Sequence, residues 1–202
     1  RAKWGSEFSK SATTDGVFHA PDGDVTHKFM HETMESTYYA ADNFAAVGKY
    51  LEGSGTMWFL LPDEGVTPES LLQRQGFLAE LTGDYSAAEL VWSVPKFDVK
   101  SSTELNGVLQ ALGVTDAFDM AEADFTPLTD NGAFLSSAMQ AARVKIDEEG
   151  VEAAAYTEIV CADSAMMEVP PTVEMNLDRP FLFVIFDNSN VPLFVGTVNT
   201  MA

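Results

Sequence analysis

Apolar and polar residues along this chain alternate over short runs, which is the pattern expected of β-strands. Two runs, Met57–Leu61 and Phe181–Phe186, are almost continuously apolar and end in turn residues, so we predict buried strands there. The last stretch, "RPFLFVIFDNSNVPLFVGTV", predicts two buried strands joined by an Asp-Asn-Ser-Asn turn. These apolar runs have the length of strands, and none approaches the length that a membrane-spanning helix requires.

Clusters of turn residues divide other strand-like stretches into hairpins. The stretch "FHAPDGDVTHKFMHE" indicates two extended runs around a Pro-Asp-Gly turn. The loose alternation of Tyr38–Leu51 is followed by "EGSG", whose residue types are typical of a hairpin turn. The stretch "AELVWSVPKFDV" again predicts strand. Most of the regular structure is therefore expected to be β-sheet.

One segment carries clear signals for the start of a helix. Thr67 offers a capping hydroxyl, Pro68 suits the first turn, and Glu69 places an acid against the helix dipole. The apolar spacing then predicts that the helix covers Leu71–Leu81, although Gly76 weakens it.

A second capped helix is predicted in "SSTELNGVLQALGV". Ser102 or Thr103 would be its cap, and Gly113 would end it. Its apolar face would consist of Leu105, Val108, Leu109 and Leu112. On propensity alone, the stretch "AFLSSAMQAARVKID" fits either a helix or a strand. The fold class predicted by these patterns is α+β, richer in strand than in helix.

The charge of the chain narrows its possible partners. It has 31 acidic and 11 basic residues and a net charge of −20. Such a field repels phosphate backbones, so we expect no nucleic-acid partner; the apolar runs likewise predict no membrane partner. An acidic surface that keeps the protein in solution accounts for this charge, and steering of a basic partner is the alternative.

Residues that could carry chemistry do not form a catalytic pattern. His27 and His31 have the spacing of metal ligands on a helix, but on a strand they lie about 13 Å apart. With His19, they are interpreted as ordinary polar residues of strands. The single cysteine, Cys161, lies in no nucleophile signature and excludes an internal disulfide. We therefore expect no metal, no cofactor and no enzymatic activity.

The segment "DEEGVEAAAYTEIV", residues 147–160, has unusually small side chains. As a strand it would present one small, uncharged face, made of Val151, Ala153, Ala155, Thr157 and Ile159. Its acids and its tyrosine would lie on the other face. Alanine favours helix and glycine disfavours both states, so an edge strand or a surface helix also fits. Such a segment suits a loop that later becomes a strand, because small side chains can enter between neighbours that are already packed.

Several motifs, in order along the chain, resemble the serpin family. "VKIDEEGVEAAAYT" resembles the serpin hinge, and "NLDRPFLFVIFDNSNVPLFVGTV" resembles the family signature with its last two strands. "PKFDVKSSTELNGVLQALGVTDAFDMAEADFTPL" is similar to the strand and helix before the hinge strand. "RAKW" resembles the end of a central-sheet strand that carries a tryptophan under the hinge.

The resemblance implies the serpin fold, with a central β-sheet A, sheets B and C, and helices. It implies that residues 1–202 are a single domain, the C-terminal portion of a serpin, with the N-terminal part missing or forming a separate chain. We expect the chain alone to expose edges of the central sheet and to associate. The hinge and reactive-centre loop would span residues 148–169.

The resemblance also implies a function, suicide inhibition of a serine protease outside the cell or at its surface. The protease would attack the exposed loop and form a covalent acyl complex, and the cleaved loop would enter the central sheet as a strand. The remaining N-terminal part of the serpin would be the other partner. A non-inhibitory serpin acting as a carrier, chaperone or storage protein is the alternative.

Particular residues carry these expectations. The hinge would comprise Glu148, Glu149, Gly150, Val151, Glu152, Ala153, Ala154 and Ala155. The residues expected to support it are Lys96, as partner of Glu148, with Trp4 and Gln140. Gln140 stands where many members have a histidine.

The reactive bond is placed by counting along the loop. Counting from Gly150 gives Ser164–Ala165, whereas counting back from the Pro170-Pro171 pair gives Met167–Glu168. The candidates are therefore Ser164, Ala165, Met166, Met167 and Glu168. None is Arg or Lys, which favours an elastase-, subtilisin- or chymotrypsin-like target over a trypsin-like one.

Overall fold

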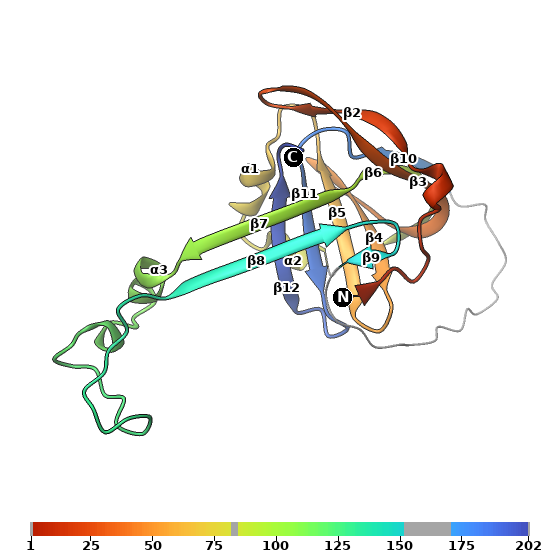
Figure 1. The fold of residues 1–202 in the computed structure, drawn as a ribbon. Helices are drawn as coiled ribbons and strands as arrows, with labels where there is room; N and C mark the ends of the chain where they lie inside the picture. Colours follow the sequence, from red (N-terminus) through yellow and green to blue (C-terminus); the bar gives the residue numbers. More distant parts are fainter. Residues whose placement is uncertain (1, 82–84, 152–170, 202) are drawn as a thin grey trace. The chain divides into compact units, whose positions relative to one another are not determined.

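The computed structural model describes residues 2–81, 85–151 and 171–201 (Figure 1). It divides into two compact units, Arg1–Asp98 with Val144–Ala202, and Val99–Arg143. In the described part of the chain, no helix is long and apolar enough to cross a membrane.

Most of the first unit is a sheet of eight strands. Seven follow the order β10-β6-β3-β4-β5-β11-β12, and β2 pairs with β3 beside this path. Their bounds are β2 (Thr14–Ala20), β3 (Gly23–Ala40), β4 (Phe44–Leu51), β5 (Gly55–Pro62), β6 (Ser86–Pro95), β10 (Thr172–Asn176), β11 (Phe181–Phe186) and β12 (Pro192–Val198). A short 3-10 helix, Lys10–Ala12, precedes β2.

A second sheet has four strands in the order β1-β9-β8-β7. They are β1 (Ala2–Lys3), β7 (Phe97–Glu104), β8 (Met139–Ile146) and β9 (Gly150–Val151). The stretch that fitted helix or strand is thus the strand β8. Its neighbours in the sheet decide this, because a strand pairs with chain far away in sequence whereas a helix bonds only within itself.

The predicted hairpins are confirmed by the strand register. Ala20 pairs with Gly23 across the Pro-Asp turn, and Leu51 pairs with Gly55 at the β4–β5 turn. β11 pairs with both β12 and β5, in antiparallel register. The two continuous apolar runs of the sequence therefore lie side by side inside the sheet.

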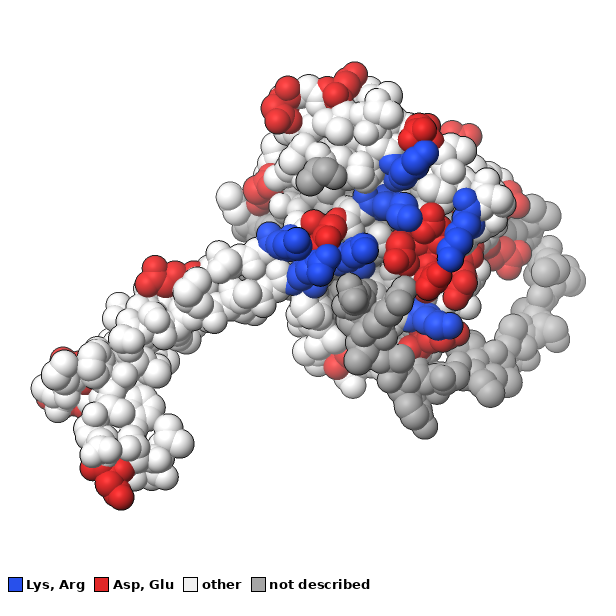
Figure 2. Space-filling model, viewed as in Figure 1, with Lys and Arg blue, Asp and Glu red and all other residues white. Residues whose placement is uncertain are grey.

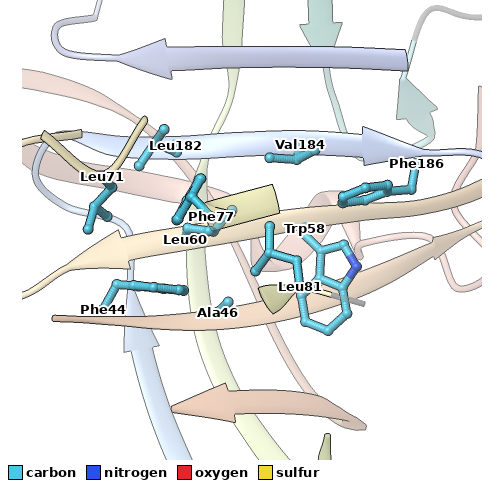
Figure 3. Packing of buried hydrophobic residues seen from close by; sticks show 10 residues of the cluster. All are labelled: Phe44, Ala46, Trp58, Leu60, Leu71, Phe77, Leu81, Leu182, Val184 and Phe186. Carbon is cyan, nitrogen blue, oxygen red and sulfur yellow. The ribbon is translucent and has the colours of Figure 1, made fainter. Parts of the chain in front are cut away.

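Burial on both faces explains why these strands are apolar throughout. On one face, residues of β4, β5 and β11 pack against α1 (Pro68–Leu72) and α2 (Phe77–Glu80) (Figure 3). This cluster consists of Phe44, Ala46, Trp58, Leu60, Leu71, Phe77, Leu81, Leu182, Val184 and Phe186. On the opposite face, Phe59 lies 6.2 Å from Trp4 and Phe183 lies 5.3 Å from Phe97, measured between ring centroids.

The first predicted helix begins as expected but is interrupted. Thr67 accepts a hydrogen bond from the Ser70 amide at 3.2 Å, which confirms the cap. The prediction of one helix over Leu71–Leu81 is wrong, because α1 ends at Leu72 and α2 begins after Gly76. Gly76 has a φ of 80°, a left-handed conformation that breaks the helix.

The second predicted helix, in the unit Val99–Arg143, is α3 (Asn106–Ala111). Its predicted cap is wrong: Ser102 and Thr103 belong to β7, and no side chain caps α3. A short 3-10 helix, Asp116–Phe118, follows. The apolar face is partly exposed in the described structure: Val108 is 52% and Leu112 76% exposed, whereas Leu105 and Leu109 are half-buried.

Candidate functional site

The candidate site is the turn after β8 together with β9, residues 147–151, which we call the hinge segment. The Asp147 amide donates to the Gly150 carbonyl at 3.1 Å. The Asp147 carboxylate accepts from the amides of Glu149, at 3.0 Å, and Gly150, at 3.2 Å. Aspartate is suited to such a turn because its short side chain reaches the backbone two and three residues further on.

The end of the hinge segment lies between two strands of the four-stranded sheet. Val151 pairs with Ala2 of β1 on one side and with Ile146 of β8 on the other. Its side chain is only 1% exposed. A small β-branched residue at this place fits a pleated, buried surface.

Gly150 is held against the backbone of β1. A Cβ atom at this position would lie 2.1 Å from the Ala2 carbonyl oxygen and 2.7 Å from Lys3 Cα. No residue with a side chain fits without moving the backbone of β1, so the hinge requires glycine here.

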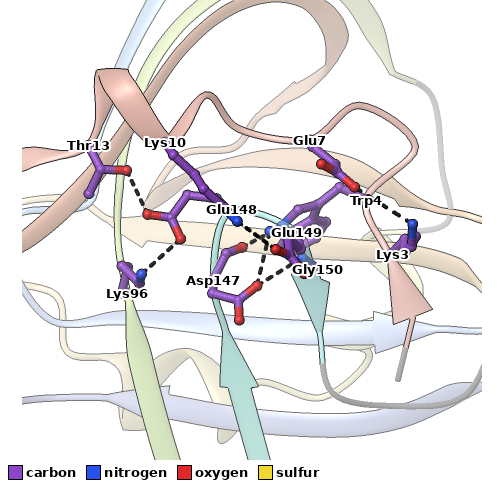
Figure 4. A network of polar contacts seen from close by, with 10 residues as sticks. All are labelled: Lys3, Trp4, Glu7, Lys10, Thr13, Lys96, Asp147, Glu148, Glu149 and Gly150. Atoms are coloured by element: carbon purple, nitrogen blue, oxygen red, sulfur yellow. Dashed lines mark hydrogen bonds and ion pairs between the residues drawn. The ribbon is translucent and has the colours of Figure 1, made fainter.

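The Glu148 carboxylate connects the hinge segment to two other parts of the chain (Figure 4). Lys96 donates to its Oε2 at 2.8 Å and Thr13 to its Oε1 at 2.8 Å. The Glu148 side chain is 10% exposed and that of Lys96 is 35% exposed. Burial raises the pKa of Glu148, but the hydrogen bonds from Lys96, the backbone and Thr13 outweigh it and lower the pKa overall.

Three backbone carbonyls of the hinge segment are hydrogen-bonded by residues 4–8, which we call the hinge-bearing segment. The Trp4 indole donates to the Asp147 carbonyl at 2.8 Å, and the Trp4 amide to the Glu149 carbonyl at 3.1 Å. The Phe8 amide donates to the Glu148 carbonyl at 3.0 Å. Trp4 thus holds the hinge through both its backbone and its side chain.

Several charged side chains around the site form ion pairs. Lys10 donates to Glu149 at 2.6 Å, and this hydrogen bond raises the pKa of Lys10. Lys28 lies 2.8 Å from Asp15. On the face shown in Figure 2, basic side chains gather in the middle of the view, with acidic side chains beside them.

The structure brings together some of the predicted site residues. Lys96, Trp4 and Glu148 meet at the hinge segment. Gln140 lies exposed near the start of β8, in the unit Val99–Arg143. Hinge residues Glu152, Ala153, Ala154 and Ala155, and the reactive-bond candidates at 164–168, lie outside the described residues.

Sequence reasoning missed Thr13, Lys10 and Phe8. The polar run around Thr13 and Lys10 has the composition of an ordinary connection, so it held no signal of their contacts with the hinge. Phe8 acts through its backbone amide, which every residue except proline has. The approach of these residues to the hinge arises only from the folding of the chain.

A family model supplies the decisive comparison. The model described as Serpin (serine protease inhibitor) matches residues 1–201. The chain belongs to the serpin family. Its strand-rich sheets with few helices are the serpin fold, as the expected fold class stated.

Curated relatives support the same assignment. The chain is 31% identical to plasminogen activator inhibitor 1 of Neovison vison, over 97% of this chain and 51% of the relative. It is 33% identical to serine proteinase inhibitor A3K of Cavia porcellus, over 98% of this chain and 48% of the relative. The chain therefore spans about half the length of the curated serpins it matches.

Solved serpin structures superpose on the chain. A serpin from Schistosoma haematobium matches 100% of this chain and 55% of its own, with a TM-score of 0.83 at 22% identity. The thermophilic serpin tengpin in its native state matches 98% and 53%, with a TM-score of 0.76 at 27% identity. A thyroxine-binding globulin complex with thyroxine matches 99% and 54%, with a TM-score of 0.79 at 27% identity. The family thus includes proteins named as inhibitors and one that binds thyroxine.

Proposed function

We propose that the protein is an irreversible, suicide inhibitor of serine-type endopeptidases, and that the protease cleaves the loop that follows the hinge segment. The observation that carries this proposal is the pairing of Gly150 and Val151 with β1, and of Val151 with β8. The first residues of the loop already occupy a strand position in the sheet. Continued pairing along the same line would insert the cleaved loop as a full strand.

The energetics of such an insertion support trapping. Each new ladder hydrogen bond contributes about 0.5–1.5 kcal/mol net, so roughly ten of them contribute on the order of ten kcal/mol. Burial of the small, uncharged residues at alternate positions after Val151 adds to this. A free energy of that size would make the acyl complex irreversible, which is what suicide inhibition requires.

The contacts of the hinge segment support insertion that begins in the correct register. The Glu148 carboxylate is tied to Lys96 and Thr13. The Glu148 carbonyl accepts from Phe8, and the carbonyls on either side of it accept from Trp4. These bonds hold the end of β8 and the start of the loop in register. Loss of the Lys96–Glu148 pair is therefore expected to loosen this end of the sheet and favour misinsertion.

The residues of the proposed reactive bond guide the choice of protease. The stretch "SAMME", residues 164–168, contains no Arg or Lys. We propose an elastase-, subtilisin- or chymotrypsin-like target and an extracellular or cell-surface location. The test incubates the full-length protein with each protease, followed by a denaturing gel and mass measurement of the released peptide.

A denaturation-resistant complex, with a released peptide that starts between Ala165 and Val169, is the expected result. Val151→Glu should abolish the complex while leaving cleavage intact, because a charge at this buried position blocks insertion. Val151→Thr, which keeps the branched shape, is the matched control and should retain the complex.

Cleavage by all three proteases without any complex would overturn the proposal. It would favour a non-inhibitory serpin that acts as a carrier, chaperone or storage protein. The structural likeness to thyroxine-binding globulin supports the carrier form of this alternative. Thyroxine binding measured by fluorescence quenching would then be the next experiment.

A further inference from the structure

Lys49, in the middle of β4, is a buried lysine next to the hinge-bearing segment. Its side chain is 1% exposed, and its Nζ lies 2.5 Å from Glu32 Oε2. The Nζ also lies 4.3 Å from the ring centroid of Phe8, 5.8 Å from that of Trp4 and 5.6 Å from that of Trp92. We call these five residues the lysine cage.

The Lys49–Glu32 ion pair contacts three residues of the hinge-bearing segment. The ammonium of Lys49 faces the rings of Trp4 and Phe8, the first and last residues of that segment. Glu32 accepts from Lys49 with one carboxylate oxygen and from the Ser6 hydroxyl, at 3.0 Å, with the other. Both members of the ion pair therefore hold residues 4–8, and three donors of residues 4–8 hold the carbonyls of the hinge segment.

Stability of the fold alone does not explain why a charged residue is buried at position 49. It lies among buried residues of β4, and desolvation lowers its pKa, against the hydrogen bond and charge of Glu32. A buried ion pair is often no more stabilising than an apolar pair of similar volume. The short contact with Glu32 and the three surrounding rings instead orient the groups around the ammonium, because both kinds of contact depend on geometry.

We propose that Lys49 is a positioning residue for the hinge. Its ammonium fixes the rings of Trp4 and Phe8. These two residues in turn hold the carbonyls of Asp147, Glu148 and Glu149 in place through hydrogen bonds. The role deepens the proposed function, on which it rests, because the same carbonyls lie at the point where the loop would begin to insert.

Hydrogen exchange of the full-length protein, followed by mass spectrometry of peptides, tests this role. Lys49→Met keeps the length and apolar character of the side chain but removes the charge. We expect exchange in the peptide that contains the Trp4 and Phe8 amides to become about tenfold faster, while exchange around Phe59 in β5 stays unchanged. Exchange of this peptide, which we call the hinge peptide, reports the hydrogen bonds from the Trp4 and Phe8 amides to the hinge segment, so it is informative whether or not the protein forms a protease complex.

A double variant separates positioning from charge balance. Lys49→Met leaves Glu32 without its cation, and this alone could destabilise or unfold the protein. Lys49→Met with Glu32→Gln removes both charges and should restore the melting temperature, yet the hinge peptide should still exchange about tenfold faster than in the wild type.

The matched control is Arg74→Met. Arg74 is also ion-paired, to Glu80 at 2.8 Å, and lies 5.9 Å from the Phe44 ring, but its partners belong to the helical side of the sheet. It should leave exchange of the hinge peptide unchanged. Two results in the double variant would overturn the proposal. One is exchange of the hinge peptide at the wild-type rate, and the other is an equal acceleration of exchange in the hinge peptide and the β5 peptide.

Discussion

Glu148 shows at the scale of a residue how the hinge depends on ionisation. Its carboxylate accepts hydrogen bonds from Lys96 and Thr13 at the same time, one on each oxygen. Only the ionised form can accept both and attract the lysine. The pKa of Glu148 is accordingly lowered in the folded protein from its ordinary value of 4.5.

This shift predicts a pH dependence of stability. A carboxylate whose pKa is lower when folded contributes stability that is fully present above the unfolded pKa. That contribution is lost as the pH falls through the folded pKa. We expect the wild type to exceed Glu148→Gln in free energy of unfolding by roughly 1 kcal/mol at pH 6, with the difference shrinking below pH ~4.5. Urea titrations of both proteins from pH 6 to pH 3 measure this difference.

Lys96→Met is the companion variant for this prediction. It removes the hydrogen bond and the positive charge that act on Glu148, so most of the pH-dependent advantage over the Gln variant should disappear in its background. A difference between wild type and Glu148→Gln that stays constant down to pH 3 would contradict the assignment of the ionised pair.

At the scale of an element, α1 depends on its first residue. The helix has five residues, too few to be stable by itself, and Thr67 satisfies one of its free amides. The helix in turn places Leu71, 1% exposed, in the core beside β4, β5 and β11. Capping and core packing are therefore linked at this end of the sheet.

Removal of the cap should lower stability by a predictable amount. We expect Thr67→Ala to reduce the free energy of unfolding by about 1 kcal/mol, because the Ser70 amide loses the Thr67 hydroxyl and keeps only the Thr67 carbonyl as its acceptor. Thr67→Ser keeps the hydroxyl and should change it by only a few tenths of a kcal/mol. Thermal and urea unfolding of the two variants compare them. An equal loss in both would assign the effect to packing of the threonine methyl group instead.

At the scale of the whole molecule, the unit Val99–Arg143 exposes large apolar side chains. Leu112 is 76% exposed, Met120 75% and Leu128 83%. Apolar surface of this kind favours association, whereas the net charge of −20 opposes it. Added salt screens the charge and should shift the balance toward association.

The 202-residue chain by itself is therefore expected to form oligomers, more so at 0.5 M than at 0.05 M salt. Size-exclusion chromatography with light scattering measures the mass directly. Replacement of Leu112, Met120 and Leu128 by Gln should reduce the associated fraction. A monodisperse, cooperatively melting monomer at both salt concentrations would contradict the prediction. Unchanged association of the triple variant would assign it to the sheet edges instead.

The sequence by itself determined the elements whose signals are local. In three places, a pattern of a few residues is enough to predict the local structure. These are the turn between Ala20 and Gly23, the cap at Thr67 and the continuous apolar runs of β5 and β11. The small residues after Gly150, together with motifs in order along the chain, also indicated the serpin family. Local signals suffice here because turn geometry, capping and burial each depend on the nearest side chains.

The tertiary structure alone decided the contacts that no motif indicated. These are the contact of Thr13 with Glu148, the hydrogen bond from the Phe8 amide to the Glu148 carbonyl, and the burial of Lys49 beside Glu32. The same holds for β8, whose propensities fitted helix or strand until its neighbours in the sheet were known. Such contacts depend on register and packing between strands, for which no short stretch of sequence carries a signal.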